Sequence, residues 1–213
     1  MATKCEPDPI VPDQNKIYGS YELNFNESEN KTSAKAIFYL NPPSTTNQQK
    51  LELNHPANVT YNGDQLIFNI NGRYYFKSFV GAVENQFVYT NFDDFTFTNG
   101  ATIPDSIDLI ITSDTISQQA NYYFQIEGDN FLANEFIDVT VTSLSSDFTF
   151  GSTFDSLSVM TIEVSAQQLQ ELGSGKAVIK VTRRLENPDI IQVTPAGGNL
   201  STQYSVQDTV FIY

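Results

Sequence analysis

The sequence predicts an all-β fold made of two tandem immunoglobulin-like or fibronectin-III-like β-sandwiches, with one short helical crossover in the second. The length of 213 residues is enough for two domains of about 100 residues each. Phe and Tyr are plentiful, at 16 and 11, whereas charged residues make up only 17%, and this composition favours pleated, half-buried strands. Short alternating segments with turn residues about every ten positions are typical of sandwiches.

The first part of the chain, residues 1–15, is expected to be a flexible acidic leader. Pro7, Pro9 and Pro12 stand among acidic residues, and no apolar periodicity is present. Proline lacks the backbone N–H donor and opposes regular strand pairing. We therefore expect a tether outside both cores, and the alternative is an ordered edge strand formed within the same residues.

Turn residues also mark a boundary between the two sandwiches. Asn99-Gly100 and then Pro104 interrupt the strand pattern. We expect the first sandwich over residues 16–103 and the second over residues 104–213, each with a core of its own.

Two Asn-Gly pairs predict β-hairpins in the first sandwich. Asn62-Gly63 and Asn71-Gly72 each separate two alternating segments. A type I′ turn needs positive φ at both central positions, which Asn-Gly supplies. If the second turn has two residues, Ile67 lies opposite Phe76.

One segment of the second half has helical signals. Ser165 is a good N-cap, and Gln168, three residues later, completes a capping box. Leu169 and Leu172 share one face, and Gly173 supplies a C-terminal cap. This pattern predicts one or two helical turns that cross between sheets.

The charge balance bears on partners. The net charge is −14 and the pI about 4.2, so phosphate backbones and anionic lipid surfaces should repel the protein. We therefore expect no nucleic-acid partner. No stretch is long and apolar enough to span a membrane, and Cys5, the single cysteine, leaves no internal disulfide.

Residues with catalytic chemistry are scarce, so we expect a protein that is not an enzyme and carries no cofactor. His55 is the only histidine and precedes Pro56 in a loop, where an exposed residue is expected rather than a member of a catalytic triad. One His and one Cys cannot make an ordinary zinc site. Cys5 lies in the leader, which disfavours a catalytic thiol.

Acidic turns are the only candidates for a metal. Asp93 and Asp94 form one cluster, and Glu127 and Asp129 form another. Calcium takes six to eight oxygens, often from loop carboxylates, so a Ca²⁺ site is the alternative to solvated turns. The same carboxylates could in principle form a glycosidase pair.

Aromatic residues are the remaining candidates for binding. Side chains alternate along a strand, so Tyr74 and Phe76 share one face and Tyr75 lies on the other. We take Tyr75 as the candidate ligand residue, an exposed ring that could stack on a sugar. Phe95 and Phe97 share a face that we assign to the core.

Several runs resemble a family of Bacteroidetes-type exported surface proteins with tandem Ig-like domains. They are ANVTYNGDQLIFNINGRYYF, QFVYTNFDDFTFTN, the crossing from Ser165 to Gly175, the pair Arg183 and Arg184, and Gly197-Gly198 before Tyr204. The resemblance covers about residues 16–213 as a pattern of strand spacing and turns. It implies Ig-like folds, export and often a lipid anchor, and it implies no catalytic activity.

The resemblance also implies an extracytoplasmic location, either on the outer-membrane-anchored surface of a bacterium or in its periplasm. Lys4 precedes Cys5, which does not fit a lipobox, so a lipid tether would lie upstream of Ala2. The tripeptide Asp-Ser/Thr-aliphatic resembles the O-glycosylation signal of exported proteins of this phylum. Its hydroxyl residues are Ser106, Thr115, Ser156 and Thr209.

Together these observations favour a non-catalytic structural or adhesion-type binding module, a monomer on the cell surface or secreted. Its ligand would be an extracellular protein or a glycan. The alternative is a carbohydrate-binding accessory protein of a glycan-uptake system, and an enzyme is the third possibility. An exposed, contiguous aromatic strip on one sheet or loop end would favour carbohydrate binding.

Overall fold

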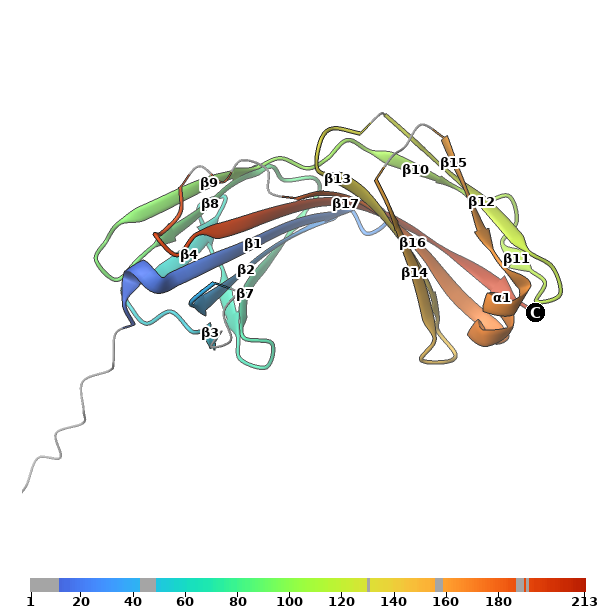
Figure 1. The fold of residues 1–213 in the computed structure, drawn as a ribbon, viewed down its shortest axis with the longest axis horizontal. Coiled ribbons are helices and arrows are strands. Elements are labelled where there is room, and N and C mark those ends of the chain that lie inside the picture. The colour runs from blue at the N-terminus through green and yellow to red at the C-terminus, as the bar shows by residue number, and fades with distance from the viewer. Residues whose placement is uncertain (1–11, 43–48, 130, 156–158, 187–189, 191) are drawn as a thin grey trace, which may run out of the picture.

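The fold consists of one large sheet and two small ones (Figure 1). The computed structural model describes residues 12–42, 49–129, 131–155, 159–186, 190 and 192–213. The all-β prediction, with sandwich-like layers and one short helix, is confirmed.

The large sheet has ten strands and runs through the whole molecule. In spatial order they are β14 (Thr149–Phe154), β13 (Glu135–Ser143), β16 (Gly175–Glu186), β17 (Gly198–Ile212), β1 (Ile17–Asn26), β2 (Lys31–Leu40), β7 (Tyr74–Val80) and β6 (Ile67–Asn69), with β3 (Gln49–Leu51) beside β2 and β11 (Thr115–Ile116) beside β17.

Each small sheet covers one end of the same face of the large sheet. The four-stranded sheet contains β5 (Asp64–Gln65), β4 (Asn58–Tyr61), β8 (Asn85–Thr90) and β9 (Thr96–Ala101). The three-stranded sheet contains β10 (Ile107–Ile110), β12 (Tyr122–Gly128) and β15 (Val159–Val164). We call the part covered by the four-stranded sheet the first lobe and the part covered by the three-stranded sheet the second lobe.

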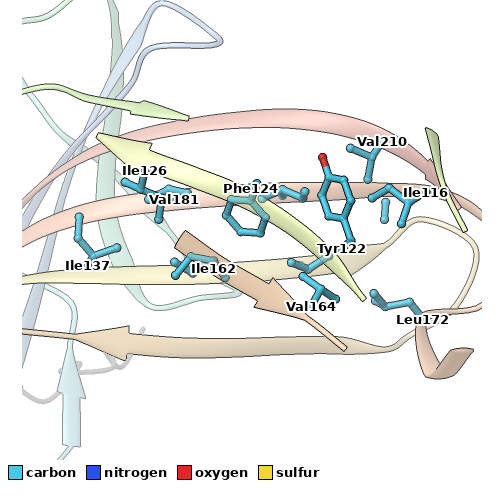
Figure 2. Packing of buried hydrophobic residues seen from close by; sticks show 14 of the residues in the cluster. Ile116, Tyr122, Phe124, Ile126, Ile137, Ile162, Val164, Leu172, Val181 and Val210 are labelled. Carbon is cyan, nitrogen blue, oxygen red and sulfur yellow. The ribbon is translucent and has the colours of Figure 1, made fainter. Parts of the chain in front are cut away.

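Each lobe has its own buried cluster. The first contains Tyr21, Phe38 and Phe87, and the second is mostly aliphatic (Figure 2). Strand alternation explains this burial, because every second residue of β1, β2 and β13 is buried while its neighbours are at least partly exposed. The long strands of the large sheet bend between the lobes, so the molecule has the shape of an arch (Figure 1).

The last strand, β17, belongs to both lobes. Its first half lies parallel to β1, from the pair Gly19 and Gly198 to the pair Asn26 and Ser205. Its whole length from Ser201 onward pairs with β16. The division of the chain at residues 103/104 stays a prediction. The start of β17, however, packs in the first lobe, where Leu200 is fully buried.

The segment before β17 also packs on the first lobe. The Gln192 side chain accepts a hydrogen bond from the backbone N–H of Thr98 at 2.8 Å. The Asn99 side chain bonds to the backbone of Gln192 in both directions, at 2.8 and 3.1 Å. These contacts join residues more than 90 positions apart in the sequence.

The predicted helical crossing is α1 (Ala166–Leu172). Ser165 caps it, and the capping box with Gln168 is present. Leu169 and Leu172 are buried in the core of the second lobe, and Gly173 has a φ of 77°. The prediction of this element is confirmed in each of these residues, because its signals are local.

The two Asn-Gly predictions have different outcomes. Asn62 and Gly63 have φ values of 54° and 76°, as a type I′ turn requires. Ile67 does lie opposite Phe76, but the last pair is Asn69 with Tyr74, so the second turn has four residues. Its left-handed residue is Arg73, with a φ of 52°, and the prediction of a two-residue turn was wrong.

Most of the predicted leader, residues 1–11, lies outside the described part of the chain, so the tether stays a prediction. The last residues of the predicted leader instead form a short 3₁₀ turn, η1 (Gln14–Lys16), capped by Asp13. The side chain of Gln14 accepts a hydrogen bond from the backbone N–H of Phe92 at 3.2 Å. The chain is therefore attached to the first lobe from this turn onward.

Candidate binding face

The ten-stranded sheet has one face that neither small sheet covers, and we call it the open face. It carries the outward residues of each strand, which alternate with the buried ones. On β1 these are Tyr18, Ser20, Glu22, Asn24 and Asn26. The open face lies on the concave side of the arch (Figure 1).

Four rings gather on the open face of the first lobe, and we call Tyr18, Tyr39, Tyr74 and Phe76 the tyrosine face. The rings of Tyr18 and Tyr39 lie on paired residues of β1 and β2, 6.4 Å apart. Tyr74 and Phe76 lie two residues apart on β7, with centroids 6.3 Å apart and the rings edge to face. Partial burial and the neighbouring Tyr39 raise the pKa of the Tyr18 phenol.

Apolar side chains extend this surface to the edge of the sheet. Ile67 on β6 lies opposite Phe76 and is 72% exposed. Val80, at the end of β7, is 87% exposed. Contiguous exposed apolar side chains are typical of interaction surfaces.

Three cations surround the tyrosine face. The Lys35 ammonium lies 5.5 Å from the ring centre of Tyr74 and 3.3 Å from a carboxylate oxygen of Glu22. Lys50 on β3 lies opposite Tyr39, and its ammonium donates to the carbonyl of Gly72 at 3.2 Å. The Arg73 guanidinium donates to the Lys50 carbonyl at 3.0 Å, so the turn and β3 hold each other in place.

The open face continues over the second lobe with a charged group around Arg184. Its guanidinium donates to Asp138 at 2.7 Å, contacts Glu186, and lies 5.2 Å from the ring centre of Phe136. Burial alone would raise the pKa of Asp138, but hydrogen bonds from Arg184 and Thr153 outweigh it and hold the pKa below its usual value.

A buried ion pair that the sequence did not predict lies beneath this face. Arg183 and Glu135 have side chains that are 0% and 1% exposed, and their charged groups are 2.7 Å apart. Glu135 also accepts from the backbone N–H of Leu132 at 2.8 Å, and Arg183 lies 5.2 Å from the ring centre of Phe131. The pair therefore anchors the turn before β13. The sequence did contain one indication of this pair. Glu135 and Arg183 each occupy a position that strand alternation assigns to the buried face.

The assignment of Tyr75 as an exposed ring was wrong. Tyr75 is 7% exposed, packs edge to face on Phe38 at 5.9 Å, and accepts a hydrogen bond from the backbone N–H of Leu53. Strand alternation correctly placed Tyr75 on the opposite face from Tyr74 and Phe76. It is Tyr75 that lies in the core, however, and Tyr74 and Phe76 that lie on the open face.

The assignment of Phe95 to the core was also wrong. Phe95 is 66% exposed, because the turn after β8 extends through it and β9 begins only at Thr96. The side chain of Asn91 accepts hydrogen bonds from the backbone N–H groups of Asp93 and Phe95, both at 2.9 Å. Phe97 is partly buried and stacks on Tyr89 at 5.7 Å, as a core residue does.

The calcium candidates lie in separate parts of the fold. Asp93 and Asp94 are exposed in the turn between β8 and β9. Glu127 and Asp129 lie at the end of β12 in the second lobe. In the ranges that the structure describes, no three His, Cys, Asp or Glu residues form a group that could hold a metal ion.

His55 is exposed and lies at a pocket of about 460 Å³ beside β4. Leu53, Asn58, Thr60 and Gln65 also line the pocket. Its lining, as far as the chain is described, includes no carboxylate that could orient the imidazole in a catalytic triad.

Three of the four candidate glycosylation hydroxyls can be placed. Ser106, Thr115 and Thr209 are exposed, and each precedes a buried aliphatic residue of the second core. Ser156 lies outside the described residues. An exposed hydroxyl followed by a buried aliphatic residue is also the ordinary result of strand alternation, so this placement is compatible with both interpretations.

No family model matches the chain, and no curated protein does. Among solved structures, the chain is similar to one described as "Structural insight into host cell surface retention of a 1.5-MDa bacterial ice-binding adhesin". The match has a TM-score of 0.26 and 13% identity, and covers 93% of this chain and 65% of that one. Within the described residues, no helix has the length and apolarity needed to cross a bilayer.

Proposed function

We propose that this chain is a non-catalytic, extracytoplasmic binding module of the adhesion type, and that the tyrosine face is its binding surface. The observation that carries the proposal is the gathering of Tyr18, Tyr39, Tyr74 and Phe76 on three neighbouring strands of the open face. These rings are at least partly exposed, and none of them belongs to either core cluster.

A rigid support favours binding by these rings. The strands β1, β2 and β7 present the rings outward, while their inward residues Leu23, Ala36 and Tyr75 are buried in the core of the first lobe. Tyrosine has few rotatable bonds, so a ring held on such a sheet loses little conformational entropy when it binds a partner.

A second candidate is a carbohydrate-binding accessory protein. The rings lie among outward hydroxyl and amide side chains, including Ser20, Asn24 and Asn199 on the paired strands β1 and β17. Amide and hydroxyl groups can donate to and accept from sugar hydroxyls, while a ring covers the apolar face of a sugar. The adjacent, partly exposed rings of Tyr74 and Phe76 support this candidate, in place of the buried Tyr75.

The test compares the wild type with a Tyr39→Ala/Tyr74→Ala variant on two arrays, one of immobilised glycans and one of immobilised extracellular-matrix proteins. We expect hits on at least one array that the double variant loses. Tyr123→Ala is the matched control, because Tyr123 is 48% exposed on β12, away from the open face. Hits that survive the double substitution, or the absence of hits on both arrays, would show the proposal to be wrong.

A further inference from the structure

The cations of this protein are unevenly distributed over its surface. The chain has 11 Lys and Arg residues against 25 Asp and Glu. The cations on the open face or at its turns are Lys31, Lys35, Lys50, Arg73, Lys176, Lys180 and Arg184. The outward carboxylates on the strands of the same face are Glu22, Asp138 and Glu186.

The outward carboxylates on the strands of the open face are each paired with a neighbouring cation. Glu22 pairs with Lys35, and Asp138 and Glu186 both contact Arg184. Lys50 and Arg73 instead contact backbone carbonyls and form no ion pair with any residue that the structure describes. They therefore retain their positive charge for a partner, and both lie beside the tyrosine face. Glu52, which follows β3, is an exposed carboxylate close in sequence to Lys50.

We propose that this surface binds an acidic polysaccharide, whose sugar rings lie on Tyr39 and Tyr74 while its carboxylate groups contact Lys50 and Arg73. The inference rests on the proposed function of the tyrosine face and names the class of its ligand. The local cations are complementary to an anion at short range. The net charge of −14 acts less strongly there, because salt screens exposed charges beyond about 8 Å at physiological ionic strength.

A polysaccharide fits this surface better than a nucleic acid, which is also a polyanion with flat rings. Duplex DNA carries one charge per about 1.7 Å, so many of its phosphates would lie within the screening length of the protein's carboxylates and be repelled by them. A uronic acid polymer carries at most one charge per sugar, and its hydroxyls match the outward Ser20, Asn24 and Asn199. Glu22, which pairs with Lys35 beside the ring of Tyr74, can accept a hydrogen bond from a sugar hydroxyl.

The experiment measures the binding of the whole chain to two immobilised probes with the same backbone. One is polygalacturonate, and the other is its fully methyl-esterified form, in which the negative charge is removed. We expect the dissociation constant to be at least about tenfold lower for polygalacturonate, and its affinity to fall as salt is raised. Single-stranded DNA is the third probe, and we expect weaker binding to it.

Two sets of variants assign the binding to the surface. Lys50→Gln/Arg73→Asn removes the two charges, and Asn tolerates the positive φ at position 73. We expect this variant to raise the dissociation constant for polygalacturonate about tenfold and to leave the weak binding of the ester unchanged. Lys77→Gln is the matched control, since Lys77 lies on β7 but pairs with Asp64 on the covered side. A thermal melt of each variant confirms that it is folded.

Several outcomes would overturn the inference. If the ester binds as tightly as polygalacturonate and Tyr39→Ala/Tyr74→Ala weakens both, the surface binds neutral glycans, and the proposed function still stands. Equal or tighter binding of DNA would make it a general polyanion site. Sedimentation showing a dimer that Lys50→Gln/Arg73→Asn dissociates would make a second copy the partner. If none of these variants weakens the binding of polygalacturonate, the binding site lies elsewhere on the protein.

Discussion

The first lobe packs aromatic rings where the second packs aliphatic side chains. In the first core, the ring centroids of Phe38 and Tyr89 are 4.6 Å apart and those of Tyr61 and Phe87 are 4.7 Å apart. In the second core, Ile and Val residues of the large and the three-stranded sheets meet around Phe124 (Figure 2). The same sheet therefore supports two different solutions to filling a core.

The difference also extends to how buried polar groups are satisfied. In the first lobe the tyrosine hydroxyls do so, as when Tyr61 donates to the carbonyl of Val83 and accepts from the N–H of Asn85. In the second lobe the buried Arg183 and Glu135 pair holds a turn against the sheet. The stability of the first lobe should therefore depend on pH and on the tyrosine hydroxyls. The stability of the second lobe should depend on the charges of the ion pair.

Alkaline pH should separate the two lobes most clearly, because it should unfold the first lobe before the second. Burial raises the pKa of Tyr61 to about 12, and it also raises the pKa of Tyr21 and Tyr89. A raised pKa favours the neutral phenol in the folded state, so this stability is complete below about pH 10 and is lost as pH rises toward 12. Brief proteolysis at each pH, with the cuts mapped by mass spectrometry, should show cleavage of β4 and β8 first.

The second lobe contains only two buried tyrosines, Tyr122 and Tyr204, against four in the first. Cuts that appear in both lobes at the same pH would contradict the expected order. They would mean that β17 couples the two cores into one cooperative unit.

Removing one partner of the buried ion pair should be the most damaging single substitution. Arg183→Met leaves Glu135 buried without its counter-ion, and we expect a loss of about 3–5 kcal/mol in the free energy of unfolding. Arg184→Met, on the same strand, is the matched control, since its side chain is 20% exposed and we expect a loss under about 1 kcal/mol. Urea denaturation measures both, and equal losses would show that burial of the pair is unimportant.

Tyr61→Phe should cost less, about 1–2 kcal/mol, because it removes two part-buried hydrogen bonds, one to the Val83 carbonyl and one from the Asn85 N–H. Tyr89→Phe is its matched control in the same core. The Tyr89 hydroxyl is buried and has no hydrogen-bond partner in the described part of the structure, so its removal should be neutral or stabilising. If urea denaturation gives both variants the same loss, the hydroxyl contacts do not fasten the first lobe.

Ser165→Ala should have the smallest effect, about 1 kcal/mol, because it removes the cap of α1 and one half of its capping box. The loss should appear in the second lobe alone, as faster hydrogen exchange of the helix and of the neighbouring β15. Gln167→Ala is the control, since the exposed Gln167 side chain donates a hydrogen bond to Glu171 within the same helix and takes no part in the cap. Faster exchange in the first lobe would show coupling through β17.

Features whose signals lie within a few residues could be predicted from the sequence. The capping box of α1, the Asn62-Gly63 turn and the pairing of Ile67 with Phe76 are of this kind. Even here the four-residue turn at Arg73 was missed, because the same register fits two turn lengths.

Features that join distant parts of the chain could not be predicted. The pairing of β1 with β17 joins residues about 180 positions apart, and neither segment has a sequence feature that indicates the other as its partner. Alternation placed Tyr75 opposite to Tyr74 and Phe76 but did not say which parity faces the core. The gathering of rings on the tyrosine face was therefore visible only in the structure, and the sequence supplied only its residue types.

The parallel pairing of β1 with β17 has a mechanical consequence. The chain enters β1 at the outer end of the first lobe and leaves β17 at the far end of the second (Figure 1). A tension applied between Ile17 and Ile212 would pull the two strands past each other along their own axes. All the hydrogen bonds between them would then bear load together in shear, instead of opening one after another. A module of this kind should stretch little and yield abruptly when it is pulled along these strands.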